Sequence, residues 1–179
     1  MEIEEAARLR ALLYETGKLL ESAVLKALRL LGFTAEPYRD GDSEFDAVFT
    51  SAEGRFLGEA EGKDTKAVNI DKLSQLERNL QEDFARDGVT EFAKGVLFGN
   101  AFRLEPPADR APFFTGKCVS PAKRLRIALV RTPDLFESVR YLSHRTDPAY
   151  AEACRRAIFD AEGAAVAFPS PAAQATNGV

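Results

Sequence analysis

Hydrophobic residues recur at a helical spacing near the start of the chain and at a strand-like spacing after it. Leu20, Val24 and Leu28 stand four residues apart within residues 18–33, which predicts an amphipathic helix that a glycine ends. A shorter pattern of the same kind, rich in alanine, leucine, glutamate and arginine, covers residues 2–14. We therefore expect two helices before the first strand.

Three short segments then show apolar and polar residues in alternation, as expected for half-buried strands. They cover residues 34–40, 44–50 and 55–62. The stretch SAEG joins the last two, with the expected turn near Glu53 and Gly54. We predict that these two strands form an antiparallel hairpin.

The second half of the chain predicts helices and buried strands. Residues 70–88 carry leucines at helical spacing, and Asp71 lies close to the start, where a negative charge suits the helix dipole. The remaining predicted elements are strands at 94–100 and 126–132, joined by a loop with Pro106, Pro107 and Pro112, and helices at 133–142 and 150–163. The order predicts an α/β fold in which helices flank a mixed central sheet.

The composition fits one globular domain with a short segment at each end. The chain has 179 residues, 45% of them hydrophobic, which suffices for a single core. We assign residues 1–15 to a linker-like helix, residues 16–145 to the domain, and residues 146–179 to a C-terminal helix and a flexible tail. No apolar stretch reaches membrane-spanning length, and the acidic N-terminus differs from a signal peptide. We therefore expect a cytoplasmic protein without membrane contact.

Histidine and cysteine offer little chemistry in this chain. His144 is the single histidine, which excludes a histidine-rich metal centre, and we interpret it as an ordinary surface residue. Cys118 and Cys154 lie far apart without CxxC spacing, and we interpret them as free thiols. The formal net charge of −4 gives no overall attraction for nucleic acid. Any chemistry must therefore use carboxylates, lysine and water.

The stretch FLGEAEGKD at residues 56–64 places several charges on one face of a predicted strand. Glu59, Glu61 and Lys63 point to the same side, because successive side chains of a strand alternate. Folding about the turn is expected to bring Asp46 roughly opposite Glu61. Clustered carboxylates repel one another, so a divalent cation with oxygen ligands, Mg²⁺ or Mn²⁺, would stabilise them.

The first long helix contributes a further carboxylate, Glu21. Val24, Leu25 and Leu28 follow it at three, four and seven residues, so Glu21 borders the helix face expected to pack on the sheet. An acidic side chain there needs a partner, and a metal site at the hairpin would provide one.

The helix with Glu21, the strand with Asp46, FLGEAEGKD and a following helix that starts IDKLSQL together resemble the restriction endonuclease-like, or PD-(D/E)XK, nuclease superfamily. The resemblance covers roughly residues 15–140 and implies an αβββαβ core. It also implies an enzyme, a Mg²⁺-dependent or Mn²⁺-dependent endonuclease that hydrolyses phosphodiester bonds of DNA. The site residues it implies are Asp46, Glu59 and Glu61 as metal ligands, Lys63 to orient or activate the attacking water, and Glu21.

Two registers of the motif are open. In the first, EGK at residues 61–63 is the E-x-K element, with Asp46 as the preceding aspartate. In the second, EAEG at residues 59–62 matches the E-V-K-G stretch frequent in the superfamily, and Glu61 replaces the lysine, as in some members. The second register leaves the role of Lys63 open. The proline that usually precedes the aspartate is absent in this chain.

Further polar residues complete the expected site. Gln75, one turn into the helix after the motif, resembles an accessory residue often seen near such sites. The segment 103–131 is basic and carries phenylalanines, so we expect it to supply phosphate contacts. The nucleic-acid-binding residues expected in it are Lys117, Lys123, Arg124 and Arg126.

Interpretations without catalysis also stay open. Glu59, Glu61 and Lys63 would then form a solvated strand face of mutually paired charges. The superfamily includes members that have lost catalysis, so the alternative function is a non-catalytic module that binds nucleic acid or a partner protein. In each case, we expect the small domain to work with a fused or partner domain or as a homodimer.

Overall fold

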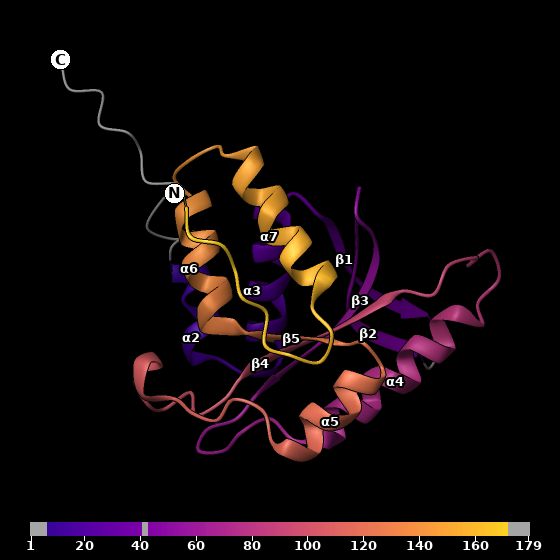
Figure 1. The fold of residues 1–179 in the computed structure, drawn as a ribbon, viewed down its shortest axis with the longest axis horizontal. Helices are drawn as coiled ribbons and strands as arrows, with labels where there is room; N and C mark the ends of the chain where they lie inside the picture. Colours follow the sequence, from indigo (N-terminus) through magenta and orange to yellow (C-terminus); the bar gives the residue numbers. More distant parts are fainter. Residues whose placement is uncertain (1–6, 41–42, 172–179) are drawn as a thin grey trace.

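The computed structural model describes residues 7–40 and 43–171 of the chain. Helices and strands are interspersed along this part of the chain (Figure 1). Their bounds are α2 Ala11–Tyr14, α3 Gly17–Leu30, β1 Thr34–Asp40, β2 Ser43–Ser51, β3 Gly54–Gly62, α4 Ile70–Phe84, β4 Lys94–Asn100, a 3₁₀ turn Pro107–Asp109, α5 Gly116–Arg124, β5 Ala128–Arg131, α6 Thr132–Leu142 and α7 Pro148–Asp160.

The strands form one five-stranded sheet in the order β1-β2-β3-β4-β5. Strands β1, β2 and β3 pair antiparallel, whereas β3, β4 and β5 pair parallel. The parallel pairs are joined by crossover connections, β3 to β4 through α4 and β4 to β5 through α5, as parallel strands require. This topology confirms the α/β fold with a mixed central sheet flanked by helices.

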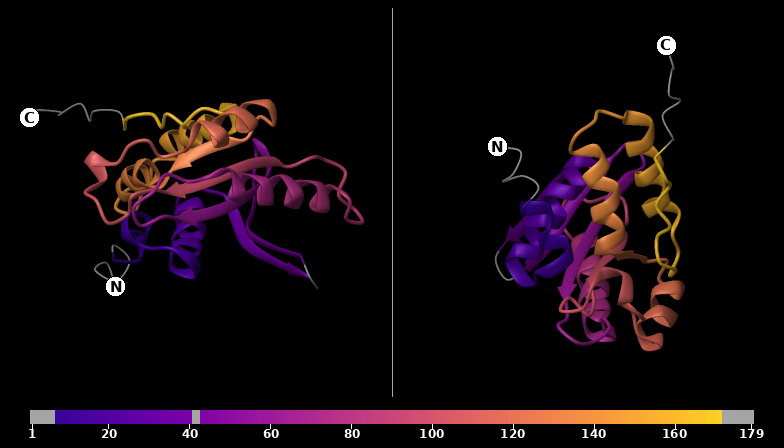
Figure 2. Two further views of the ribbon diagram at one scale, coloured as in Figure 1. Left: turned by 90° about the horizontal axis from the view of Figure 1, so that it is seen from below. Right: turned by 90° about the vertical axis from the view of Figure 1, so that its left-hand side faces the viewer.

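Helices cover both faces of the sheet, and each face has its own hydrophobic core. One core lies between the sheet and helices α2, α3, α6 and α7, and the other lies between the sheet and helices α4 and α5. Figure 1 shows α4 and α5 side by side, apart from the group formed by α3, α6 and α7. Figure 2 shows the layers from two further sides, with the β1–β2 hairpin extending away from the helices.

Phenylalanines dominate the core on the α3 side of the sheet. The rings of Phe49 and Phe56 are stacked with centroids 5.0 Å apart, and Phe33 meets Phe49 edge-on at 5.0 Å. Gly58 leaves the space that these rings need, because a Cβ atom there would lie 2.8 Å from Phe98 and 3.2 Å from Phe49. Gly58 therefore makes room for the aromatic core on the face of β3 opposite the charged residues.

The segment expected to be a loop between β4 and β5 contains a helix that the sequence interpretation missed. Helix α5 buries Cys118 and Ala122, which stand four residues apart, and it includes Pro121. A proline inside a helix removes one backbone hydrogen bond. The two buried side chains and the contact with α4 outweigh that loss.

The C-terminal segment runs along the edge of the sheet. Helix α7 packs into the core through Tyr150, Cys154 and Ile158. Beyond it, the N–H of Val166 donates to the carbonyl of Leu129 at 2.8 Å. The predicted flexible tail stays a prediction for residues 172–179, and part of the predicted N-terminal helix, residues 1–6, likewise lies outside the described residues.

Within residues 7–40 and 43–171, no helix is both long enough and apolar enough to cross a bilayer.

Gly58→Val is expected to destabilise the protein by about 1–3 kcal/mol, because the new side chain must displace two buried rings. Urea unfolding followed by circular dichroism measures this change. Gly116→Ala is the control, since a Cβ atom at Gly116 meets nothing within 4 Å. Equal stability of the two variants would contradict the close packing at Gly58.

Candidate active site

Strand β2 contains an irregularity at Asp46. Glu36 pairs with Val48 and Tyr38 pairs with Phe45, so two residues of β2, Asp46 and Ala47, lie opposite one residue of β1. Such a bulge bends a strand and redirects its side chains. The single residue opposite is Pro37 of β1, which has no N–H group to donate to a neighbouring strand.

The bulge directs the carboxylate of Asp46 onto the neighbouring strand. Regular pairing between β2 and β3 ends at Ala47 and Gly58, and the Oδ2 atom of Asp46 accepts a hydrogen bond from the N–H of Ala60 at 2.9 Å. Asp46 is thereby placed beside Glu59. Expecting Asp46 opposite Glu61 was wrong.

The physical reason for this correction is the position of the turn. Ser51 pairs with Gly54, so the two residues between them form the turn. The sequence interpretation centred the turn one residue later, near Glu53 and Gly54. A shift of one residue in the turn changes the partner on the opposite strand by two residues, from Glu61 to Glu59.

Glu59 is the buried centre of the site, with 0% of its surface exposed. Its Oε1 atom accepts a hydrogen bond from Asn79 Nδ2 at 2.6 Å. Its Oε2 atom lies 2.7 Å from Lys72 Nζ, whereas the same Nζ lies 3.5 Å from Asp46 Oδ2. One ammonium group therefore stands between the two carboxylates.

This environment changes the acidity of the buried groups. Burial, followed by the negative charge of Asp46, raises the pKa of Glu59 to about 7, although the nearby Lys72 acts in the opposite direction. Burial would by itself lower the pKa of Lys72, but the hydrogen bond and charge of Glu59, with smaller contributions from Asp46 and Glu61, raise it. Lys72 therefore stays protonated at neutral pH, and Glu59 holds or releases its proton near neutrality.

Glu61 and Lys63 lie further along the same face of β3. Lys63 Nζ is 2.5 Å from Glu61 Oε1, and both side chains are half-buried. Glu61 is near enough to influence Lys72 through its charge. In the structure, the first glutamate of EAEG, Glu59, lies beside Asp46, as in the second register. Glu61 and Lys63 form an ion pair next to these two residues.

Glu21 has a different partner from the one expected. It forms an ion pair with Lys18 at 2.7 Å, and the same lysine lies 2.9 Å from Glu44. Among the interactions that the structure describes, none joins Glu21 to Asp46 or Glu59. Its role in the site stays a prediction.

Helix α4 supplies two site residues that the sequence interpretation missed, Lys72 and Asn79. They stand seven residues apart, on the helix face that also carries the buried Leu76 and Leu80. Polar residues within a buried stripe need partners, and this spacing is the signal that could have identified them. Gln75, which was expected near the site, accepts a hydrogen bond from Lys72 Nζ at 3.3 Å.

The site can be tested for its fit to a magnesium ion. Within the described residues, no group of three histidine, cysteine, aspartate or glutamate side chains is arranged to hold a metal ion. However, Mg²⁺ commonly binds through only one or two carboxylates together with water and substrate phosphates. The fully buried Oε2 atom of Glu59 has no hydrogen bond, only the ion pair with Lys72. Asp46 and Glu59 therefore fit a magnesium ion that a phosphate helps to hold.

The expected basic residues lie on or just after α5. Lys117, Lys123 and Arg124 are exposed, and no ion pair of theirs is seen in the described part of the chain. Arg126, in contrast, is paired with Glu162. The N-terminal end of α5 follows a bridge between Val68 and Phe114, so Lys117 lies near the loop that leads into α4.

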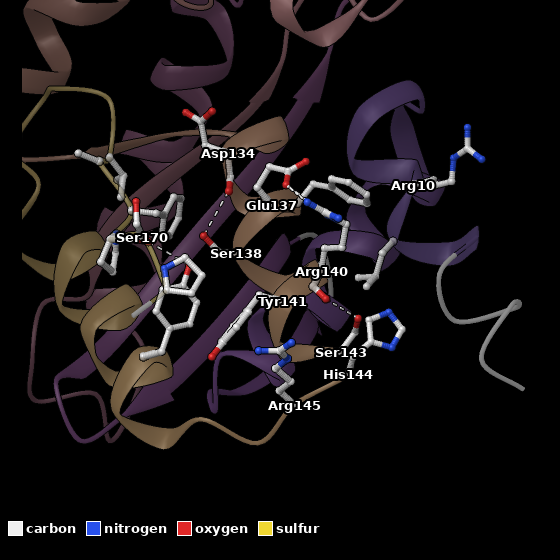
Figure 3. Close-up of a pocket in the computed structure, with 18 residues that line it drawn as sticks. Arg10, Asp134, Glu137, Ser138, Arg140, Tyr141, Ser143, His144, Arg145 and Ser170 are labelled. Carbon is white, nitrogen blue, oxygen red and sulfur yellow. Dashed lines mark hydrogen bonds and ion pairs between the residues drawn. The ribbon is translucent and has the colours of Figure 1, made fainter. Parts of the chain in front are cut away.

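A cavity of about 860 Å³ lies elsewhere on the molecule, beside α6 and the segment 166–171. Figure 3 shows its polar side chains, among them Arg140, Tyr141 and Arg145, with the exposed His144 at its edge. None of the carboxylates of the hairpin lines it. The candidate active site is therefore the carboxylate cluster and not this cavity.

Comparison with solved structures identifies the architecture. The structure of the restriction endonuclease FokI matches with a TM-score of 0.58 and 14% sequence identity, over 93% of this chain. The protein VC1899 from Vibrio cholerae matches with a TM-score of 0.43 and 15% identity, over 72% of this chain and 33% of its own. No protein-family profile matches the chain, and no curated protein does so.

The FokI match shows that the chain has a restriction endonuclease-like fold, as the resemblance in its sequence implied. The match covers 31% of the FokI chain, so this chain is similar to one part of a larger protein.

Glu59→Gln is expected to make the protein progressively more stable than the wild type as the pH rises from 5 to 7. Folded wild-type protein keeps the proton of Glu59 up to about pH 7, whereas the unfolded chain releases it at about pH 4.3. The free energy of unfolding therefore falls between these values, by at most about 1.4 kcal/mol per pH unit.

Urea titrations at pH 5, 6, 7 and 8 measure the difference between the two proteins. Glu77→Gln, at an exposed glutamate of the neighbouring helix α4, shows the effect of the substitution in solvent. A Glu59→Gln difference that does not grow with pH would show that Glu59 is ionised throughout.

Proposed function

We propose that this protein hydrolyses phosphodiester bonds of DNA in a reaction that depends on Mg²⁺ or Mn²⁺. The observation that carries the proposal is the convergence of Asp46, Glu59 and Lys72 at the bulge of β2, with Lys72 Nζ 2.7 Å and 3.5 Å from the two carboxylates. The restriction endonuclease-like fold supports it. Fold alone does not establish activity, so the site is the main argument.

Each side chain has a task in this reaction. Asp46 and Glu59 would hold the metal ion, and Asn79 keeps the Glu59 carboxylate in position. Lys72 supplies the positive charge that the EAEG stretch lacks, and it orients the attacking water or the phosphate. The bound ion would acidify water and neutralise negative charge on the phosphate. Glu61, the third carboxylate expected to bind the ion, forms an ion pair with Lys63.

A second candidate function is a non-catalytic module that binds nucleic acid or a protein. The observation that favours it is that both oxygens of the Glu59 carboxylate have partners within the protein, because Asn79 donates a hydrogen bond to Oε1 and Lys72 forms an ion pair with Oε2. Such a network would also serve as a purely structural contact between α4 and the sheet. The plasmid cleavage experiment described next distinguishes the two functions.

Wild-type protein is expected to nick supercoiled plasmid in the presence of Mg²⁺ or Mn²⁺ but not EDTA. Asp46→Ala and Glu59→Gln should each lose at least about a hundredfold in rate, because each removes a metal ligand. Gel electrophoresis over a time course measures nicking, and Glu77→Gln is the control. Absence of metal-dependent cleavage on supercoiled, linear and single-stranded DNA would favour the non-catalytic module.

Lys117→Gln is expected to weaken DNA binding at low salt and to reduce the slope of log K against log salt by about 0.9. Arg126→Gln is the matched comparison, because Arg126 already pairs with Glu162. Fluorescence anisotropy with a labelled duplex and Ca²⁺ in place of Mg²⁺, at several salt concentrations, gives both slopes. Equal slopes for both variants would exclude α5 from the DNA interface.

The match to one part of FokI supports one further element of the proposal. We propose that this domain acts together with a fused or partner domain, or as a homodimer, because it matches only 31% of the longer FokI chain.

A further inference from the structure

The position of Lys72 raises the question of how a metal ion enters the site. The Nζ atom lies 2.7 Å from Glu59 Oε2, 3.3 Å from Gln75 Oε1 and 3.5 Å from Asp46 Oδ2. An ammonium group has three N–H donors, and here three oxygens surround it. Its place between the two carboxylates is the place that a metal ion bound by both would take.

Formal charges show what the entry of a metal ion would do. With all three groups ionised, Asp46, Glu59 and Lys72 together carry one negative charge, while Glu61 and Lys63 cancel one another. A divalent cation would turn this sum into one positive charge in a largely buried place, where charge imbalance is costly. One phosphodiester group restores neutrality. Metal binding is therefore unfavourable without the phosphate and favourable with it.

The surroundings of Glu59 make the carboxylate a fixed partner and Lys72 a movable one. Asn79 is buried and holds Oε1 of Glu59 at 2.6 Å, so the carboxylate cannot turn away. Lys72 has 16% of its side chain exposed and a long flexible stem, so its ammonium can move towards solvent. An arriving phosphate on that side would attract it.

We propose that Lys72 is a resident counter-ion that competes with the metal ion until a DNA phosphate draws it away. This inference rests on the proposed nuclease function and adds a regulation of the same site. Its consequence is that the metal ion and DNA bind cooperatively, each tightening the binding of the other by the same factor. The arrangement keeps free protein from holding a loaded metal centre in the absence of DNA.

The experiment measures Mn²⁺ affinity in the absence of DNA, from the electron paramagnetic resonance signal of free Mn²⁺. Lys72→Gln is expected to bind Mn²⁺ at least about tenfold more tightly than the wild type, because the competing charge is gone. Lys66→Gln is the matched control: it removes the same charge from an exposed lysine between β3 and α4, and the Mn²⁺ affinity should change by less than about threefold. Equal or weaker Mn²⁺ binding by Lys72→Gln would overturn the inference.

A wild-type measurement keeps the test decisive if Lys72→Gln does not fold. Adding a phosphorothioate duplex, which resists hydrolysis, should tighten Mn²⁺ binding by at least about tenfold, the factor that a coupling free energy of about 1.4 kcal/mol gives. Unchanged Mn²⁺ affinity on adding DNA, in a protein that nicks plasmid, would overturn the counter-ion role and leave the nuclease function standing. Failure to bind Mn²⁺ under either condition would overturn both.

Discussion

The ion pair between Lys72 and the fully buried Glu59 is the interaction on which the rest of the site depends. A carboxylate removed from water is costly unless charge and hydrogen bonds replace its hydration. Helix α4 supplies both replacements, through Lys72 and Asn79. The site therefore exists only when α4 is seated on β3, and its geometry is a consequence of the packing of these two elements.

A second buried ion pair ties the same two elements together. Asp83, near the end of α4, is fully buried and accepts two hydrogen bonds from Arg55, near the start of β3. Glu59 and Arg55 stand four residues apart on the strand, and their partners lie near opposite ends of the helix. Buried ion pairs contribute little net stability compared with apolar packing, but an unpaired buried charge is strongly penalised. The two pairs thus select one position of α4 along β3 from those that leucine packing alone would allow.

The carboxylates of Asp46 and Glu59 occupy a point where the sheet changes from antiparallel to parallel pairing. Strand β3 pairs antiparallel with β2 on one side and parallel with β4 on the other. The bulge in β2 frees the N–H of Ala60 from regular pairing, and Asp46 takes it up with its side chain. The bulge therefore gives the N–H of Ala60 an acceptor, and it also places Asp46 beside Glu59. The bulge also explains why Pro37 can stand opposite Asp46 on β1, since a proline in a regularly paired strand would leave one backbone hydrogen bond unmade.

Much of this protein follows from its sequence alone. Period-two and helical patterns specify the order of strands and helices, because burial of one face imposes that periodicity on any chain. The alternation in FLGEAEGKD already places Glu59 and Glu61 on the face opposite the phenylalanine core. Tertiary structure decided the rest: the position of the turn made Glu59 the partner of Asp46, and the seating of α4 brought in Lys72 and Asn79. Contacts between residues distant in the chain depend on the register of packed elements, and a one-residue shift in a turn or a helix is invisible in the local pattern.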